Sequence, residues 1–291
     1  MRRITLLALV AAATIGVTAQ EDDTRQIVPE EFVKRRPAPA APAARKPAAY
    51  RVARRVDPSA TAGADDVAIG LTLWRLRPAR AGDTGTRLLV QEATGSSDWV
   101  PERVDADAEL VIGDHVRLAI ESPREGYLYV LDREQYADGT SSPSYLIFPT
   151  ARTRGGDNAV RPGRLVEIPA RDDRPNYFTV RRNRADQVAE VLHVVYSASP
   201  IEALPVRATA AAVPDAQLTA WIKDWSGPTE QLARVDHGTW SQAESRAGAD
   251  ASRLLTQDDP PPQTIYRLRA RKGQPALFEV RLPYGAGATK P

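Results

Sequence analysis

Three carboxylates, Asp132, Glu134 and Asp138, occur at i, i+2 and i+6 and are followed by Gly139. Hard cations such as Ca²⁺ bind several oxygens presented by one turn, so this spacing resembles part of a calcium loop. The EF-hand pattern is not met, however, and Asp-Gly is a common two-residue hairpin turn. We therefore predict a turn at Asp138-Gly139 and no metal site.

Tyrosines and arginines close to these carboxylates could form a binding surface. The loop from Arg152 to Arg164 is rich in arginine, and guanidinium groups can hold an anion. A solvated loop explains this composition equally well. Tyrosines in strands can line a binding face for peptide or glycan, or they can simply pack with the hydroxyl at the surface, which we favour. The candidate binding-face residues are Tyr127, Tyr129, Tyr136, Tyr145, Arg152 and Arg154.

The sequence contains no recognisable catalytic motif. It has no G-x-S-x-G elbow, no S-x-x-K pair and no phosphate-binding glycine loop. Its three histidines, His115, His193 and His237, have no local spacing typical of zinc, and the absence of cysteine excludes thiolate chemistry. We predict no cofactor and no enzymatic activity. The alternative is a hydrolase that uses carboxylates such as Asp114, Asp132 and Glu134, which would need separations of about 5 to 9.5 Å across a cleft.

The elements that must position these side chains are β-strands. Apolar and polar residues alternate with a period of two, as in half-buried strands. In residues 115–122, for example, Val116, Leu118 and Ile120 face one way, and Arg117 and Glu121 face the other. The predicted strands are 67–76, 87–92, a short edge strand at 99–105, 115–122, 127–131, 145–148, 164–168, 177–181, 193–197, 264–270 and 277–282. We expect 115–122 and 127–131 to form a hairpin.

Two further segments have other signatures. Residues 185–192 could form a short helix leading into the strand at 193–197, or the first part of that strand. From Pro214 to Trp225 the apolar residues Leu218, Trp221 and Ile222 lie on one helical stripe. Pro214 is suited to the first turn of a helix, so we predict one short accessory helix here.

The central stretch from Leu110 to Pro169 resembles a bacterial family of unknown function, domain-of-unknown-function (DUF) family 4384. In chain order, the matching motifs are Ile112-Gly113-Asp114 with Val116-Arg117-Leu118, then Gly126-Tyr127-Leu128-Tyr129-Val130, then Phe148-Pro149, Asn158, Pro162-Gly163 and Ile168-Pro169. The resemblance covers roughly residues 67–199. It implies a β-sandwich-like module of exported or surface proteins for which no activity is established.

The composition divides the chain into segments. A short basic start, an apolar run of about 14 residues and Val17-Thr18-Ala19 are typical of a secretory signal peptide, too short to span a bilayer. The next segment is rich in Pro and Ala and, from Arg25 to Val56, carries nine Lys/Arg against two Glu. The predicted organisation is a signal peptide at 1–19, a disordered basic linker at 20–66, a β-sandwich at 67–204, a helical segment at 205–228, a low-order linker at 229–263 and a C-terminal β-hairpin at 264–284 completing the sandwich.

These features predict a mainly β protein, an antiparallel β-sandwich (Greek-key-like) with one short accessory α-helix and disordered N-terminal and internal linkers. We expect an exported protein, periplasmic or extracellular, without a transmembrane helix. The net charge of +2 gives no reason to expect specific nucleic-acid binding. The most consistent function is a non-enzymatic binding or scaffolding module of the bacterial cell envelope, with a protein or envelope-polymer partner. A weaker alternative makes the basic arm at Arg25–Val56 the functional part and the sandwich its carrier.

Overall fold

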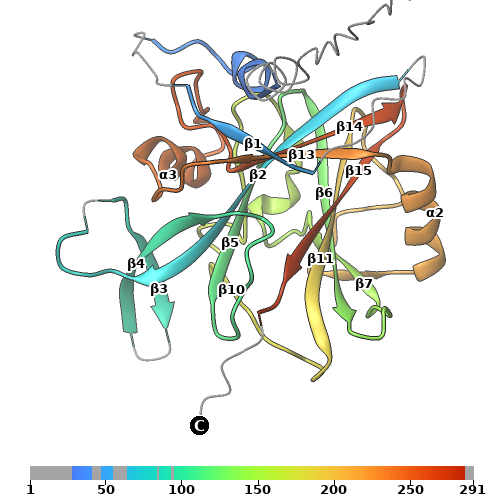
Figure 1. Cartoon of the computed structure of the whole chain (residues 1–291), viewed down its shortest axis with the longest axis horizontal. Coiled ribbons are helices and arrows are strands. Elements are labelled where there is room, and N and C mark those ends of the chain that lie inside the picture. The colour runs from blue at the N-terminus through green and yellow to red at the C-terminus, as the bar shows by residue number, and fades with distance from the viewer. Residues whose placement is uncertain (1–27, 41–46, 55–63, 84, 93–94, 286–291) are drawn as a thin grey trace, which may run out of the picture.

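The computed structural model describes residues 28–40, 47–54, 64–83, 85–92 and 95–285. The predicted signal peptide and part of the predicted N-terminal linker lie outside these ranges. The fold is mainly β and consists of two antiparallel sheets packed face to face, as predicted (Figure 1). The two sheets do not close into a barrel.

Within the described residues the chain forms fifteen strands and the two α-helices α2 and α3, and residues 28–34 form a further short helix. The elements are β1 (Tyr50–Arg54), β2 (Ala64–Pro78), β3 (Leu88–Glu92), β4 (Gly95–Val104), β5 (His115–Glu121), β6 (Gly126–Tyr136), β7 (Ser144–Phe148), the short 3₁₀ helix η1 (Arg154–Gly156), β8 (Ala159–Val160), β9 (Val166–Ile168), β10 (Phe178–Thr179), β11 (Gln187–Ser197), β12 (Ala211–Val213), α2 (Asp215–Trp225), β13 (Thr229–Arg234), α3 (Gln242–Ala249), β14 (Thr264–Arg271) and β15 (Ala276–Pro283).

One sheet has nine strands and is organised around the long strand β2. The order β1-β13-β14-β2-β4-β3 runs across it, with β14 and β4 following each other along one edge of β2. The opposite edge of β2 pairs with β5, which in turn pairs with β9 and β10. The second sheet has six strands in the order β12-β7-β6-β11-β15, and β8 pairs with the start of β6.

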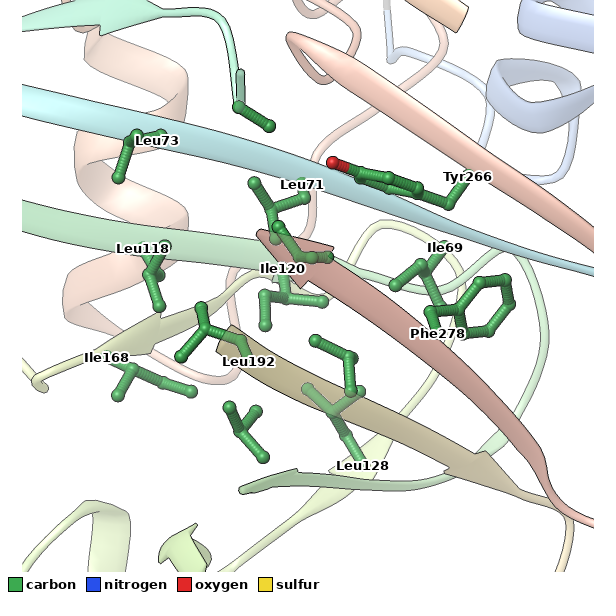
Figure 2. Packing of buried hydrophobic residues seen from close by; sticks show 14 of the residues in the cluster. Ile69, Leu71, Leu73, Leu118, Ile120, Leu128, Ile168, Leu192, Tyr266 and Phe278 are labelled. Atoms are coloured by element: carbon green, nitrogen blue, oxygen red, sulfur yellow. The ribbon is translucent and has the colours of Figure 1, made fainter. Parts of the chain in front are cut away.

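The main core lies between the two sheets. Figure 2 shows Leu71 of β2 and Ile120 of β5 pointing from one sheet toward Leu128 of β6, Leu192 of β11 and Phe278 of β15 on the other. Each of these side chains is at most 3% exposed. Burial of apolar side chains at this density is the main stabilising contribution to a fold of this kind.

The outer face of each sheet is also covered. Over the six-stranded sheet, Leu218 and Trp221 of α2 pack against Tyr129 and Val195. Over the nine-stranded sheet, α3 and the chain that follows it pack against Trp74. The covering helices (Figure 1) explain why strand residues that alternate outward are buried as well as those that point inward.

The segments predicted as linkers contribute structure, which corrects two of our expectations. Within 20–66, residues 28–34 are helical and β1 pairs with β13. Within 229–263, β13 pairs with β14, and α3 begins with a capping box in which Ser241 and Glu244 bond each other's backbone. Both segments are polar, and their few apolar side chains, such as Phe32 and Leu232, are the ones that pack.

The two predicted hairpins are wrong, because in each of them the chain passes from one sheet to the other. β5 lies in the nine-stranded sheet and β6 in the six-stranded sheet, and β14 and β15 are divided in the same way. The C-terminal strands therefore complete the sandwich by adding one strand to each sheet. The predicted strands are otherwise present, and β11 runs unbroken over Gln187–Ser197 with no helical start.

β4 is longer than predicted and lies inside the sheet, between β2 and β3. Pro101 is tolerated there because β3 pairs with β4 only as far as Trp99. The carbonyl of Pro101 accepts a bond from the Trp240 backbone N–H, so its proline nitrogen also faces the side that β3 leaves free.

Candidate functional site

A cavity of about 160 Å³ lies between the two sheets at the end of the sandwich where β10 and the last described residues are found (Figure 1). Its walls come from both sheets and are mostly apolar. The lining residues are Leu110, Val116, Leu118, Asp132, Ile147, Phe178, Thr179, Val180, Glu190, Leu192, Leu282 and Tyr284. Among them are two carboxylates and no Lys, Arg or His.

The two carboxylates, Asp132 and Glu190, come from adjacent strands of the six-stranded sheet. Asp132 on β6 lies opposite Leu192 on β11, and Glu190 is two residues before Leu192 on the same face. Such diagonal neighbours lie within reach of one another's long side chains. The two carboxyl groups are close enough to influence each other's pKa, and two buried anions side by side repel, so we expect the pair to hold one proton.

The surroundings of the pair differ on its two sides. Glu190 Oε1 accepts hydrogen bonds from Tyr284 Oη at 2.8 Å and from Gln187 Nε2 at 2.9 Å. Glu190 Oε2 and Asp132 Oδ1 are buried without a donor from elsewhere in the described protein. Hydrogen bonds to Glu190 favour its charged form, so the proton of the pair is expected on Asp132.

Burial is the main cause that raises the pKa of Asp132 well above its usual range, and repulsion from Glu190 and Glu134 adds to it. Burial also raises the pKa of Glu190, while the bond from Tyr284 opposes that change. Burial and the adjacent Glu190 raise the pKa of Tyr284, which keeps its hydroxyl protonated as a donor. The two carboxyl groups in the cavity lining are therefore expected to form an anionic pair that holds one proton.

We expect Asp132→Asn to increase the stability of the protein at neutral pH. Because the folded state binds the Asp132 proton more tightly than the unfolded state, the stability from this group is complete below the unfolded pKa of about 4 and is lost as pH rises through the raised folded pKa. Asparagine can donate to Glu190 at every pH and avoids this loss.

Urea unfolding of the two proteins across pH checks this expectation. The difference between Asp132→Asn and the parent protein should be small near about pH 4 and grow toward neutral pH in favour of the variant. His193, whose pKa burial lowers to about 4, is present in both proteins, so its titration cancels in the comparison. A stability difference that does not change with pH would contradict the shared proton.

The structure brings together only part of the carboxylate set that the sequence suggested. Glu134 is on the same strand as Asp132 and accepts bonds from Tyr136 Oη and Asn183 Nδ2. Asp114 instead pairs with Arg75 at 3.0 Å and does not line the cavity. Glu190 was missed because it lies in an apolar strand 58 positions after Asp132, and only strand pairing makes them neighbours.

The predicted turn at Asp138-Gly139 is present. Gly139 has a φ of +84°, and Asp138 Oδ1 accepts bonds from the backbone N–H and the hydroxyl of Thr140. Within the described residues, no three His, Asp or Glu side chains are grouped so that they could hold a metal ion.

The candidate tyrosines do not form one surface. Tyr127 and Tyr129 lie on the outer face of the six-stranded sheet under the covering residues 201–225, and Tyr129 Oη accepts a bond from Ile201 N. Tyr136 is buried beneath Arg184. Tyr145 is 44% exposed and lies directly across from Asp132 on β7, on the face that contains the cavity. A role in binding stays a prediction for these residues.

The two candidate arginines lie in the loop between β7 and β8. Arg152 is exposed, whereas Arg154 is half-buried and donates to the carbonyl of Leu165. Burial lowers the pKa of Arg154, and the neighbouring Arg164 acts in the same direction. Arg164 itself pairs with Asp157. Arg154 and Arg164 thus bond neighbouring residues of the protein itself.

Three ion pairs are buried on the outer face of the nine-stranded sheet. Their partners are Arg117 with Glu167, Arg36 with Glu121, and Arg103 with Glu244. The alternation in β5 suggested that Arg117 and Glu121 face solvent, but the side chains are at most 2% exposed. These pairs attach the N-terminal residues and α3 to the sheet, so we assign them a structural role.

A comparison of the chain with protein-family models, curated proteins and solved structures finds no match. In the part of the chain that the structure describes, no helix is long and apolar enough to span a bilayer. The function therefore has to be argued from the cavity itself.

Proposed function

We propose that this protein is a non-enzymatic binding module of the bacterial cell envelope, and that its ligand occupies the cavity between the sheets. The observation that carries the proposal is an apolar space that reaches the protein surface and has two carboxyl groups in its lining. Apolar lining with a few placed polar groups is typical of ligand sites.

The rim of the cavity supports the same proposal. Phe178 lines the cavity and is 38% exposed, and Val111 and Ile112, which follow the lining residue Leu110, are 47% and 43% exposed. The backbone bond from Gly113 to Val180 places this loop beside β10. Large apolar side chains gathered at one place on a surface commonly mark an interaction site.

Export is part of the proposal and rests on the N-terminal pattern and on the resemblance to DUF family 4384. The mass of the protein recovered from the host periplasm or medium should correspond to a chain that begins at Gln20.

The binding test uses toluene, because a cavity of about 150 Å³ lined by apolar residues binds benzene-sized molecules. We expect toluene to shift the amide resonances of residues 116–118, 178–180 and 190–192 in a saturable manner. Ile147→Trp places a large ring at the half-buried edge of the cavity and should abolish these shifts. Val235→Trp, at a position 57% exposed and outside the cavity lining, should leave them unchanged. Absence of saturable shifts in the parent protein would overturn the proposal.

A second candidate is a carboxylate-dependent hydrolase, favoured by the shared proton of Asp132 and Glu190. Two carboxyl groups that hold one proton are also the acid-base arrangement of aspartic proteases. Turnover of a peptide substrate that Asp132→Asn abolishes would favour the hydrolase over the binding module.

A further inference from the structure

We propose that the cavity binds small apolar primary amines, with the ammonium group held between Asp132 and Glu190. This inference rests on the proposed function, because it names the class of ligand for the same cavity. It follows from the size of the cavity, from the charge in its lining and from the atoms that lack a partner.

The size sets the apolar part of the ligand. A space of about 160 Å³ is close to that of an engineered cavity of roughly 150 Å³ that accepts benzene. One six-membered ring or a short branched alkyl group therefore fills it. Leu118, Leu192 and Leu282 provide apolar contacts from both sheets.

The charge sets the polar part. The ionisable groups in the cavity lining are Asp132 from β6, Glu190 from β11 and Tyr284 after β15, and the carboxylate of Glu134 on β6 is close enough to act on Asp132 and Tyr284. The residues that β5 and β10 contribute to the lining carry no charge. Two carboxyl groups therefore line a site whose lining contains no Lys, Arg or His, and an ammonium ion complements them.

The unsatisfied atoms set the geometry. Tyr284 and Gln187 already hold Glu190 Oε1, so this side chain is fixed in place. The remaining buried oxygens, Glu190 Oε2 and Asp132 Oδ1, have no hydrogen-bond partner among the described residues, and we expect the pair to hold one proton. An ammonium group has three donors and can bond both oxygens once that proton has left. Binding an amine should thus release one proton from the pair.

Calorimetry with benzylamine and its neutral analogue benzyl alcohol tests the inference on the full chain. We expect benzylamine to bind about tenfold more tightly, or better, near neutral pH, as charge-assisted hydrogen bonds in a dry site predict. Its affinity should weaken toward acid pH, where protons compete for the carboxylates. Titrations in buffers with different ionisation enthalpies should show release of one proton per ligand.

Variants separate this inference from the proposed function. Glu190→Gln with Asp132→Asn should remove the preference for benzylamine and keep the binding of toluene, which also shows that the fold is intact. Glu202→Gln, an exposed carboxylate elsewhere, should change neither. Toluene binding with no preference for benzylamine overturns the inference and leaves the binding module standing. Failure of every probe, toluene included, overturns both.

Discussion

Replacing Glu167 by glutamine is expected to destabilise the protein by about 3 to 5 kcal/mol, because it leaves Arg117 charged and buried without an anion. The Arg117 side chain is 1% exposed, and its Nη2 lies 2.9 Å from Glu167 Oε2. Arg117 also donates to the carbonyl of Asn176. An arginine cannot shed its proton in a protein, so it has no means of becoming neutral.

α3 makes this pair difficult to rearrange. A methyl group placed on Gly248 of α3 would come within 2.1 Å of the Glu167 carboxyl carbon. The helix therefore rests on the carboxylate, and water has no room to replace the lost anion. Loss of the pair should also loosen α3, since Arg171 extends from the same region to Ser245.

Urea unfolding measures this effect, and a double variant tests its cause. Arg117→Met combined with Glu167→Leu removes both charges and should recover most of the lost stability, since apolar replacements of buried pairs are often neutral or better. Glu202→Gln serves as the exposed control and should stay within about 0.5 kcal/mol of the parent. If Glu167→Gln lowers the free energy of unfolding by less than about 1 kcal/mol, the ion pair between Arg117 and Glu167 is not a buried, water-free contact.

The second large effect is expected for Arg36→Ala, at about 3 to 5 kcal/mol. Arg36 Nη2 lies 2.6 Å from Glu121 Oε1, and both side chains are 2% exposed. The guanidinium also donates to the carbonyls of Thr256, Asp259 and Pro260. One side chain thus joins the N-terminal segment, β5 and the chain before β14.

Glu121 can respond to the loss in a way that Arg117 cannot. Burial already raises the pKa of Glu121, and Arg36 is the main group that opposes this. Without Arg36 the carboxyl group should bind a proton and become neutral, so the cost is expected at the lower end of the range for a fully buried charge. The variant should be less destabilised at acid pH than at neutral pH.

The matched control is Arg35→Ala, which changes the exposed neighbouring arginine and should stay within about 0.5 kcal/mol of the parent protein. Limited proteolysis gives a second measurement: residues 28–40 should become cleavable in Arg36→Ala and remain protected in Arg35→Ala. Equal stability of the two variants would mean that the N-terminal segment is only loosely attached.

This result also bears on the hypothesis that the basic arm at Arg25–Val56 is a tether. The arm contains Arg36 and the buried Tyr50, whose hydroxyl donates to the carbonyl of Pro262. Deleting the arm would therefore damage the fold as well as remove charge. Charge reversal at exposed positions such as Arg35 is the better way to test for electrostatic attachment.

Sequence patterns predicted where the strands lie, because the alternation of side chains follows from the backbone geometry of a strand. They also predicted the turn at Asp138-Gly139 and the helix at Asp215–Trp225. The same patterns could not say which strands pair. β5 and β6 would each have an apolar inner face if they paired in one sheet, and they also have one in the structure, where they lie in different sheets across the core. The predicted hairpins were wrong for this reason.

A mainly β sandwich could be predicted from the amino-acid sequence, since local alternation and turn residues are properties of short stretches. The burial of Arg36, Arg117 and Glu167 could not be predicted in this way, because it depends on α3 and the N-terminal segment packing over β5. The pairing of β6 with β11 likewise decided that Asp132 meets Glu190. Such a site depends on long-range contacts, and long-range contacts leave no local periodicity in the chain.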